Sequence, residues 1–136
     1  MNPNPKIYFC ADDFGMTPQT CDRIFACNTQ GCLNKIGVLS NTELPDIKER
    51  LQECGERHIA ISVHLNLVEG RCLCHPSDIP LLVNENGYFK YSFTELLKVS
   101  MGHQRRQFQE QVKRELKAQI ERAVSLFPEG TPLQLD

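Results

Sequence analysis

The feature of this sequence that most constrains its fold is a regular exchange of short strand-like runs with stretches of helical spacing. The strand-like runs are rich in β-forming apolar residues, and they are 6–11, 35–39, 59–67 and 131–136. The helical stretches carry helical apolar spacing or helix-start signals, and they are 17–31, 45–55, 94–101 and 104–126. Alternation of this kind predicts parallel strands joined by right-handed helical crossovers.

We therefore expect an α/β fold with the element order β-α-β-α-β-loop-α-β. An open sheet and a fragment of a barrel have the same order at this level of description. A closed β/α barrel needs about eight strands and typically about 250 residues, so the 136 residues of this chain do not make a complete barrel. Residues 6–11 form a short, mainly apolar run rich in β-forming residues, which predicts a first strand that is buried on both faces.

Residues with special backbone preferences mark the ends of the expected helices. Thr17 is an N-cap candidate followed by proline at the first helical position, and Gly31 is a natural stop. Pro45 is placed to open the second helix and Gly55 to close it.

The clearest period-two pattern of the chain lies between 59 and 67. Its apolar face comprises Ile59, Ile61, Val63, Leu65 and Leu67. Its other face comprises Ala60, Ser62, His64 and Asn66. Residues 71–90, rich in Pro, Asn and Gly, then predict a long loop of the kind that is usually functional or mobile. The long helix that follows shows an apolar register of Phe108, Val112, Leu116 and Ile120.

Charge and hydropathy argue against nucleic acid and membrane as partners. The net charge of −2 and the pI near 6.1 disfavour nucleic acid, which needs a concentrated basic surface. The basic residues of 103–117 alternate with Glu110, Glu115 and Glu121, which predicts a solvated helix face. No apolar run approaches the roughly 18 residues of a membrane span, and the N-terminus lacks the plan of a signal peptide. We therefore expect a cytoplasmic protein.

The seven cysteines do not suggest a disulfide framework, because their number is odd and no secretion signal accompanies them. Cys72, Cys74 and His75 resemble half of a metal knuckle. The second Cys/His pair that structural zinc uses is missing at the required spacing. We interpret these three residues as ordinary loop residues.

Two groups of metal-capable residues follow strands, at the side where parallel α/β folds place their sites. They are Asp12 with Asp13 after the first strand, and His64 with Asn66 near the end of the third. One carboxylate can bind a cation while its neighbour accepts a proton from bound water. The alternatives are an aspartate that caps the next helix and a histidine that is satisfied in the core. The remaining histidines, expected to be structural or solvated, are His58, His75 and His103.

Two extended motifs of the sequence resemble those of the YdjC-like family of carbohydrate deacetylases, which includes the chitooligosaccharide deacetylases. The first is Ala-Asp-Asp-Phe-Gly at 11–15, and the second is Val-His-Leu-Asn-Leu-Val-Glu-Gly at 63–70. Residues 80–83 and 87–89 resemble the loop before the family's long helix. Residues 115–121, followed by Gly130, Pro132 and 135–136, resemble the approach to its next motif. That histidine-rich motif begins with an aspartate, and this chain ends on the corresponding Asp136. Cys10, Cys72 and Cys74 depart from the family pattern at peripheral positions.

The resemblance implies a barrel-like β/α fold, a divalent metal ion (Mg²⁺ or Zn²⁺) and hydrolysis of an N-acetyl group from acetylated amino sugars or short chitooligosaccharides. By motif matching, Asp12 is the candidate general base and Asp13 and His64 are candidate metal ligands. Glu69, with the loop 71–90, is the candidate substrate-binding residue. Residues 1–136 then correspond to the N-terminal part of a single deacetylase domain, and we expect the remaining histidine ligand and the general acid beyond Asp136.

Alternative functions remain open at this point. One is a non-catalytic sugar- or metal-binding fragment, because Asp13 and His64 supply two ligands where catalytic zinc usually has three. Another is a different metal-dependent hydrolase on the same scaffold. The expected partner is a small carbohydrate, with neither nucleic acid nor membrane. A homo-oligomer is also expected, since the stretch 133–136 would leave a strand edge uncovered.

Overall fold

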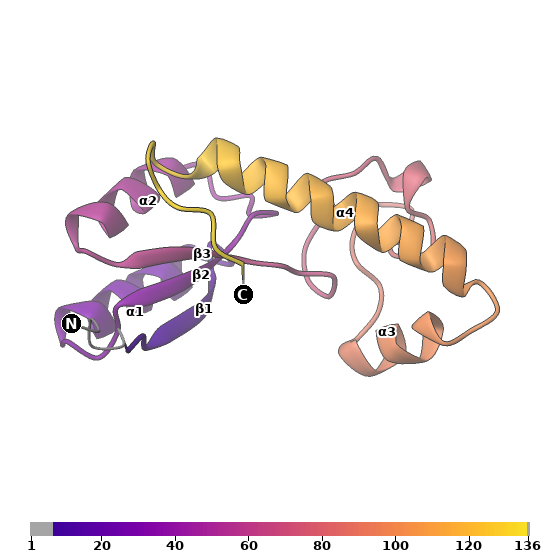
Figure 1. Ribbon diagram of the computed structural model, residues 1–136, viewed down its shortest axis with the longest axis horizontal. Coiled ribbons are helices and arrows are strands. Elements are labelled where there is room, and N and C mark those ends of the chain that lie inside the picture. Colours follow the sequence, from indigo (N-terminus) through magenta and orange to yellow (C-terminus); the bar gives the residue numbers. More distant parts are fainter. Residues whose placement is uncertain (1–6, 136) are drawn as a thin grey trace, which may run out of the picture. The chain divides into compact units, whose positions relative to one another are not determined.

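The computed structural model describes residues 7–135 and confirms an α/β fold with a parallel sheet (Figure 1). The elements, in chain order, are β1 (Cys10–Phe14), α1 (Pro18–Thr29), β2 (Lys35–Leu39), α2 (Ile47–Glu56), β3 (Ala60–His64), the 3₁₀ turn η1 (Pro76–Asp78), α3 (Phe93–Ser100) and α4 (Arg105–Leu126). The chain forms two compact units. The sheet unit comprises the described residues of 7–39, 43–64 and 126–135, and the α4 unit comprises 40–42 and 65–125.

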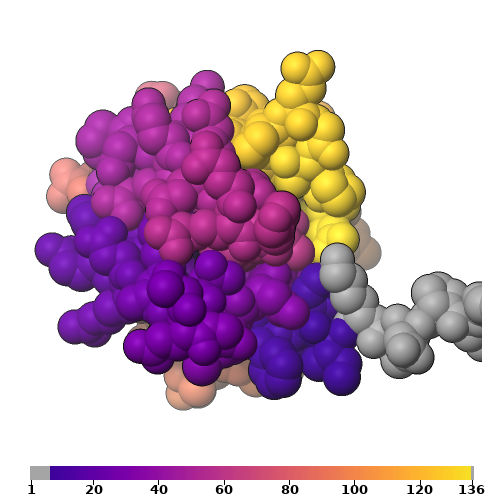
Figure 2. Space-filling view, turned by 90° about the vertical axis from the view of Figure 1, so that its left-hand side faces the viewer, coloured from indigo at the N-terminus to yellow at the C-terminus, as the bar shows by residue number. Residues whose placement is uncertain are grey.

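The sheet unit is built on three parallel strands in the order β1-β2-β3. The pairing of β2 with β3 is regular and places Leu39 opposite His64. On the other side of β3, Leu135 makes a parallel bridge to Val63, and the Val63 amide donates to the carbonyl of Gln134 at 2.8 Å. Figure 2 shows this yellow C-terminal segment beside magenta residues of the unit. Of the expected strand 131–136, the structure shows an isolated bridge at Leu135. Asp136 lies outside the described residues.

Helix α1 begins and ends at the predicted residues. The hydroxyl of Thr17 accepts a hydrogen bond from the Thr20 amide at 3.1 Å, as an N-cap does. Gly31 follows the helix with φ +76°, and its amide donates to the carbonyl of Asn28. A left-handed residue at this position is the usual end of a helix, which is why glycine fits there.

Helix α2 departs from the prediction at both ends. It begins at Ile47 rather than Pro45, and Gly55 lies inside it. The left-handed residue that closes α2 is His58, with φ +56°. Its amide donates to the carbonyl of Gly55 at 3.1 Å, while the Ile59 amide donates to Cys54 at 2.9 Å. This pair of bonds satisfies the last carbonyls of the helix, so histidine here takes the position that usually favours glycine.

The prediction of a first strand buried on both faces at 6–11 was wrong. Strand β1 begins at Cys10, while Ile7 is 69% and Phe9 is 64% exposed. The reason is that β1 lies at one edge of the described sheet, and residues 7–9 precede its paired segment. The third strand is also shorter than its alternation suggested, because β3 ends at His64.

The core of the sheet unit lies between the sheet and the helices α1 and α2. Right-handed crossovers between neighbouring parallel strands place both helices on one face of the sheet. The buried residues of this core are Phe14, Cys21, Ile24, Phe25, Leu33, Ile36, Val38, Ile47, Leu51, Cys54, Ile59, Ile61 and Leu126. Burial raises the pKa of the Cys54 thiol to about 12, so that thiol stays protonated at neutral pH.

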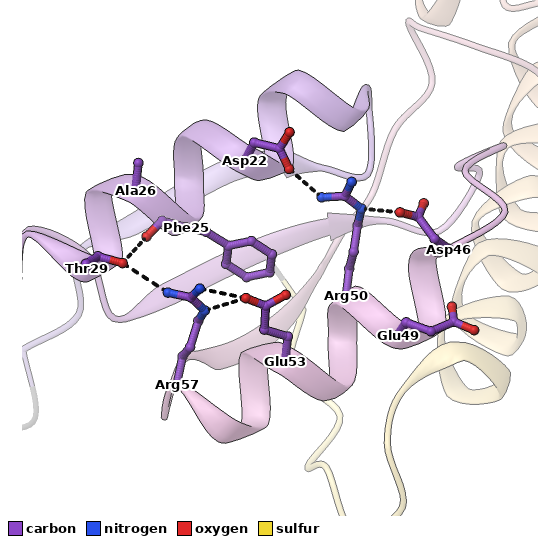
Figure 3. Close-up of a pocket in the computed structure, with 9 residues that line it drawn as sticks. All are labelled: Asp22, Phe25, Ala26, Thr29, Asp46, Glu49, Arg50, Glu53 and Arg57. Carbon is purple, nitrogen blue, oxygen red and sulfur yellow. Dashed lines mark hydrogen bonds and ion pairs between the residues drawn. The ribbon is translucent and has the colours of Figure 1, made fainter.

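A charged groove runs between α1 and α2 (Figure 3). Arg50 of α2 donates to Asp22 of α1 and to Asp46, in both cases at 2.7 Å. These bonds raise the pKa of the Arg50 guanidinium. The guanidinium of Arg57 lies 4.8 Å from the centre of the Phe25 ring. Both arginines thus already have an acidic or aromatic partner. We interpret the charged residues of the groove as contacts that join α1 to α2.

In the α4 unit, the predicted long loop 71–90 is folded. Arg71 pairs with Tyr88 and Val83 with Phe89 through antiparallel bridges. The loop contributes most of an apolar cluster made of Ile79, Leu82, Val83, Phe89 and Phe108. Helix α3 follows the loop and begins with a capping box in which Ser92 and Glu95 bond reciprocally.

The buried face of α4 differs from the predicted one. Of the expected apolar register, Phe108 is buried, whereas Val112, Leu116 and Ile120 are half-buried. The buried positions of α4 include a polar series at helical spacing, namely Gln111, Glu115 and Gln119. The interpretation of Glu115 as part of a solvated face was therefore wrong, since its exposure is 0%. No helix within 7–135 is long and apolar enough to cross a membrane.

Candidate functional site

The Asp12–Asp13 pair lies in a β-bulge at the end of β1. The pairing advances from Ala11 to Phe14 on β1 while β2 advances from Ile36 to Val38, so β1 contains one extra residue here. A bulge re-aims the side chains at the point where it occurs. Asp13 takes up the distortion with φ +62°. Holding a non-glycine residue in this region costs about 1 kcal/mol or more, and such strain is concentrated at functional sites.

The structure brings Asp13 and His64 together. The distance from Asp13 Oδ1 to His64 Nε2 is 3.5 Å, and the side chains are 45% and 30% exposed. His64 is the last residue of β3, and it is paired with Leu39 at the end of β2. The side chains of Asp13 and His64 therefore meet at the carboxyl edge of the sheet, where parallel α/β folds place their sites.

The donor atoms of this pair fit a divalent cation. Zinc takes carboxylate oxygens and histidine nitrogens at about 2.0–2.2 Å, which places two donors of one tetrahedral ion roughly 3.4 Å apart. Nε2 is the imidazole nitrogen of His64 that faces Asp13. Its Nδ1 atom is buried without a hydrogen-bond partner among the described residues. Within 7–135, no group of three or more His, Cys, Asp or Glu side chains is arranged to hold a metal ion. The described pair supplies two ligands.

Asp12 is exposed, and its Oδ1 accepts a hydrogen bond from the Cys10 thiol at 3.6 Å. The alternative in which an aspartate of this pair caps the following helix does not hold, because Thr17 caps α1. A carboxylate that is exposed and adjacent in sequence to a ligand candidate suits proton transfer to and from water. The general-base role of Asp12 stays a prediction.

Asn66, predicted as a metal-capable group beside His64, is used instead to shape a turn in the α4 unit. Its Oδ1 accepts from the amides of Val68 and Glu69 at 2.9 and 3.0 Å. Its Nδ2 donates to the Glu69 carbonyl at 2.6 Å and to Asn41 Oδ1 at 3.3 Å. Both ends of the carboxamide are thus engaged in local bonds that fix the backbone of 66–69.

Glu69, the predicted substrate-binding residue, belongs to the α4 unit and is exposed. Its carbonyl also accepts from Asn41 Nδ2 at 3.0 Å. The next residue, Gly70, has φ +78°, and a Cβ there would lie 3.1 Å from Asn41 Nδ2. The motif residues after His64 therefore fix the course of the loop and leave the Glu69 side chain toward solvent.

The Cys72–His75 stretch does not form a metal site in the structure. The Cys72 thiol donates to the Cys74 carbonyl at 3.1 Å, and His75 Nδ1 lies 2.8 Å from the Ser77 hydroxyl. Burial, followed by the nearby carboxylate of Glu115, raises the pKa of Cys74 to about 11. These bonds tie Cys72 and His75 to neighbouring loop residues, and the interpretation of 72–75 as ordinary loop residues stays a prediction.

Sequence reasoning missed the polar series of α4, although its i, i+4 spacing was visible. Glu115 accepts hydrogen bonds from the amides of Leu73 and Cys74 at 3.1 and 3.0 Å. Gln119 Nε2 donates to Glu115 Oε1 at 2.9 Å. Gln111 Oε1 accepts from the Leu81 amide at 2.8 Å. The signal that could have found them is a charged or amide residue at every fourth position of a helix whose apolar register is weak.

Comparison with known families gives a match to a family model. Residues 6–128 match the family described as YdjC-like protein. The match covers both motifs, the loop after them and the whole of α4.

Two curated relatives have the name carbohydrate deacetylase. The one from Thermoanaerobacter pseudethanolicus is 30% identical over 119 residues, which are 85% of this chain and 43% of that protein. The one from Danio rerio is 28% identical over 127 residues, which are 92% of this chain and 38% of that protein. The chain thus spans less than half the length of these relatives.

A solved structure from Enterococcus faecalis, of a protein proposed to cleave cellobiose phosphate, has the same fold. The two superpose with a TM-score of 0.72 at 24% sequence identity. The superposition covers 93% of this chain and 46% of the other.

Proposed function

Since the chain belongs to the family of YdjC-like proteins, we propose that the intact protein is a carbohydrate deacetylase that removes the N-acetyl group of acetylated amino sugars or short chitooligosaccharides. The names of two relatives support this activity class. The observation that carries the proposal is the 3.5 Å approach of Asp13 and His64 at a strained bulge on the carboxyl edge of the sheet.

Asp13 and His64 are proposed to hold a divalent cation, Mg²⁺ or Zn²⁺, through Oδ1 and Nε2. When bound, such an ion lowers the pKa of a water molecule and polarises the amide carbonyl of the substrate. The donor types and their separation support this assignment. The strained backbone of Asp13 is then explained as the cost of directing its carboxylate at His64.

Asp12 is proposed as the general base. Its carboxylate takes a proton from the attacking water as the water oxygen bonds to the carbonyl carbon. The C–N bond then breaks, acetate leaves, and the amine nitrogen receives a proton from a separate acid. Glu69 is proposed to accept hydrogen bonds from sugar hydroxyls, because its side chain is exposed on a backbone fixed by Asn66 and Asn41.

The direct test is acetate release from diacetylchitobiose, measured for the 136-residue chain and for the full-length protein, with and without a chelator. We expect release by the full-length protein that stops on chelation, and loss of at least about 100-fold for Asp13→Asn or His64→Ala. Glu129→Gln, an exposed acid, is the matched control and should leave the rate unchanged. Absence of release under every metal condition would rule out the deacetylase.

A second candidate is a sugar- or metal-binding module without catalysis, and the two-ligand count of the described residues favours it for the 136-residue chain. Calorimetric titration with zinc or magnesium separates the two. Weak binding by this chain that becomes tight in a longer protein supports the enzyme. Equal binding by both, without acetate release, supports the module.

A further inference from the structure

In the α4 unit, the backbone that follows β3 is held by a helix side chain. The carboxamide of Gln119 bonds to both polar groups of the Asn66 backbone. Its Oε1 accepts from the Asn66 amide at 2.9 Å, and its Nε2 donates to the Asn66 carbonyl at 2.6 Å. Strand pairing normally supplies such a two-point contact, and here one amide side chain replaces it.

A second contact point lies one helical turn earlier. Glu115 accepts from the amides of Leu73 and Cys74 and is joined to Gln119 by the 2.9 Å bond between them. Both side chains are 0% exposed. Burying an amide and a carboxylate is unfavourable unless their bonds are satisfied, and a fully satisfied buried network fixes one geometry. The segment 66–74 is therefore held near both of its ends from α4.

Between these two contact points, the loop is fixed around Glu69. Its carbonyl accepts from the side chains of Asn66 and Asn41, and Asn41 Nδ2 also donates to the carbonyl of Arg71 at 3.1 Å. The backbone of Glu69 thus has little freedom, while its side chain remains exposed. Rigid presentation of a polar side chain reduces the ordering cost of ligand binding.

We propose that Gln119 and Glu115 are positioning residues for sugar binding. They hold 66–74 in the conformation that presents the Glu69 carboxylate, and they act through the loop without touching the substrate. This inference rests on the proposed function, because it assigns Glu69 to the sugar. A purely structural role would lower stability without a specific effect on sugar affinity.

The test is a double-mutant cycle in the full-length protein, with diacetylchitobiose affinity measured by calorimetry. Gln119→Leu removes both bonds to Asn66 at similar volume and should raise the sugar Kd about tenfold. Glu69→Ala should raise it by a similar factor. If Gln119 acts through Glu69, the double variant should be no weaker than Glu69→Ala alone. Zinc affinity should change less than about twofold in Gln119→Leu, because the ligand candidates belong to the sheet unit.

Hydrogen exchange and a milder variant keep the outcome decisive. Amides of 66–74 should exchange at least about tenfold faster in Gln119→Leu, whereas Gln109→Leu, an exposed residue of the same helix, is the matched control. If Gln119→Leu does not fold, Glu115→Gln replaces it in the cycle. If the amides of 66–74 exchange faster but the sugar Kd is unchanged, the positioning role of Gln119 is overturned, whereas the proposed function is not. Absence of sugar binding by the unmodified protein would overturn the proposed function, and this inference with it.

Discussion

The interiors of the two units are stabilised by different kinds of interaction. Among its described residues, the sheet unit has a core of thirteen buried apolar residues and one buried polar residue, Ser62. The apolar cluster of the α4 unit has five residues, and five further buried polar residues of the described chain 7–135 belong to this unit: Ser40, Asn41, Gln111, Glu115 and Gln119. Apolar burial is non-directional and tolerates small changes of shape, whereas a polar network needs every partner in place.

This difference matches the parts proposed for the two units. In the sheet unit, a rigid apolar core supports a strained bulge, so that Asp13 faces His64. In the α4 unit, the loop 66–74 lies outside the sheet, makes an isolated bridge at Arg71, and is held against α4 by Glu115 and Gln119. We therefore expect substitutions in the first unit to act through volume, and those in the second to act through hydrogen bonds.

The largest expected effect is on the apolar core. Leu51→Ala should lower the free energy of unfolding by about 3 kcal/mol, because Leu51 is fully buried and the substitution leaves a cavity. Leu97→Ala in α3, where the side chain is 53% exposed, should cost about 0.5 kcal/mol or less. Denaturant titration measures both. Equal losses would contradict the assignment of the core.

The next effect tests the polar network. Glu115→Gln keeps the volume but replaces a carboxylate oxygen by an NH₂ group that faces backbone donors, so we expect a loss of about 2 kcal/mol. Glu121→Gln, whose side chain is 67% exposed, should stay within about 0.5 kcal/mol in the same titration. An unchanged free energy of unfolding in Glu115→Gln would contradict the claim that hydrogen bonds stabilise the α4 unit.

Alkaline pH should weaken the sheet unit through Cys54. Burial raises its folded-state pKa from 9.0 to about 12, so the folded protein keeps a proton that the unfolded chain has lost. Stability is therefore intact below pH 9 and falls as the pH rises toward 12, by at most about 1.4 kcal/mol per pH unit. Cys54→Ala should flatten this slope, and Cys32→Ala, at an exposed site, should not.

The smallest expected effect is a gain in stability. Asp13→Gly removes the strain of a side chain at φ +62° and should stabilise the sheet unit by about 0.5–1 kcal/mol. His58→Gly, at φ +56°, should give a similar gain and serves as the control away from the site. Thermal unfolding measures both. A loss of stability in Asp13→Gly would show that the carboxylate contributes more than the strain costs.

The sheet unit could largely be predicted from the sequence. Thr17, Gly31 and the run 35–39 carry local signals that act within a few residues, and the structure agrees with them. The motifs placed Asp13 and His64 at one edge, where they meet. The exposed Ile7 and Phe9 could not be foreseen, because burial of a strand depends on which neighbours pair with it.

The α4 unit was harder to predict because its stability depends on partners distant in sequence. The sequence alone predicts a solvated Glu115, because its partners, the amides of Leu73 and Cys74, lie about 40 positions away. The sequence likewise suggests Asn66 as a metal-ligand candidate, whereas in the structure its side chain accepts the hydrogen bonds of a turn. Hydrogen bonds between a side chain and a distant backbone leave no periodic pattern in the sequence.

The most direct test of the account is a cobalt(II) titration of the full-length protein, read by the visible absorption of the bound ion. If Asp13 and His64 hold the same cation, Asp13→Asn and His64→Ala should each weaken binding at least about tenfold. The double variant should lose little more than either single variant, because both contacts serve one ion. Unchanged affinity in the single variants would contradict the shared site.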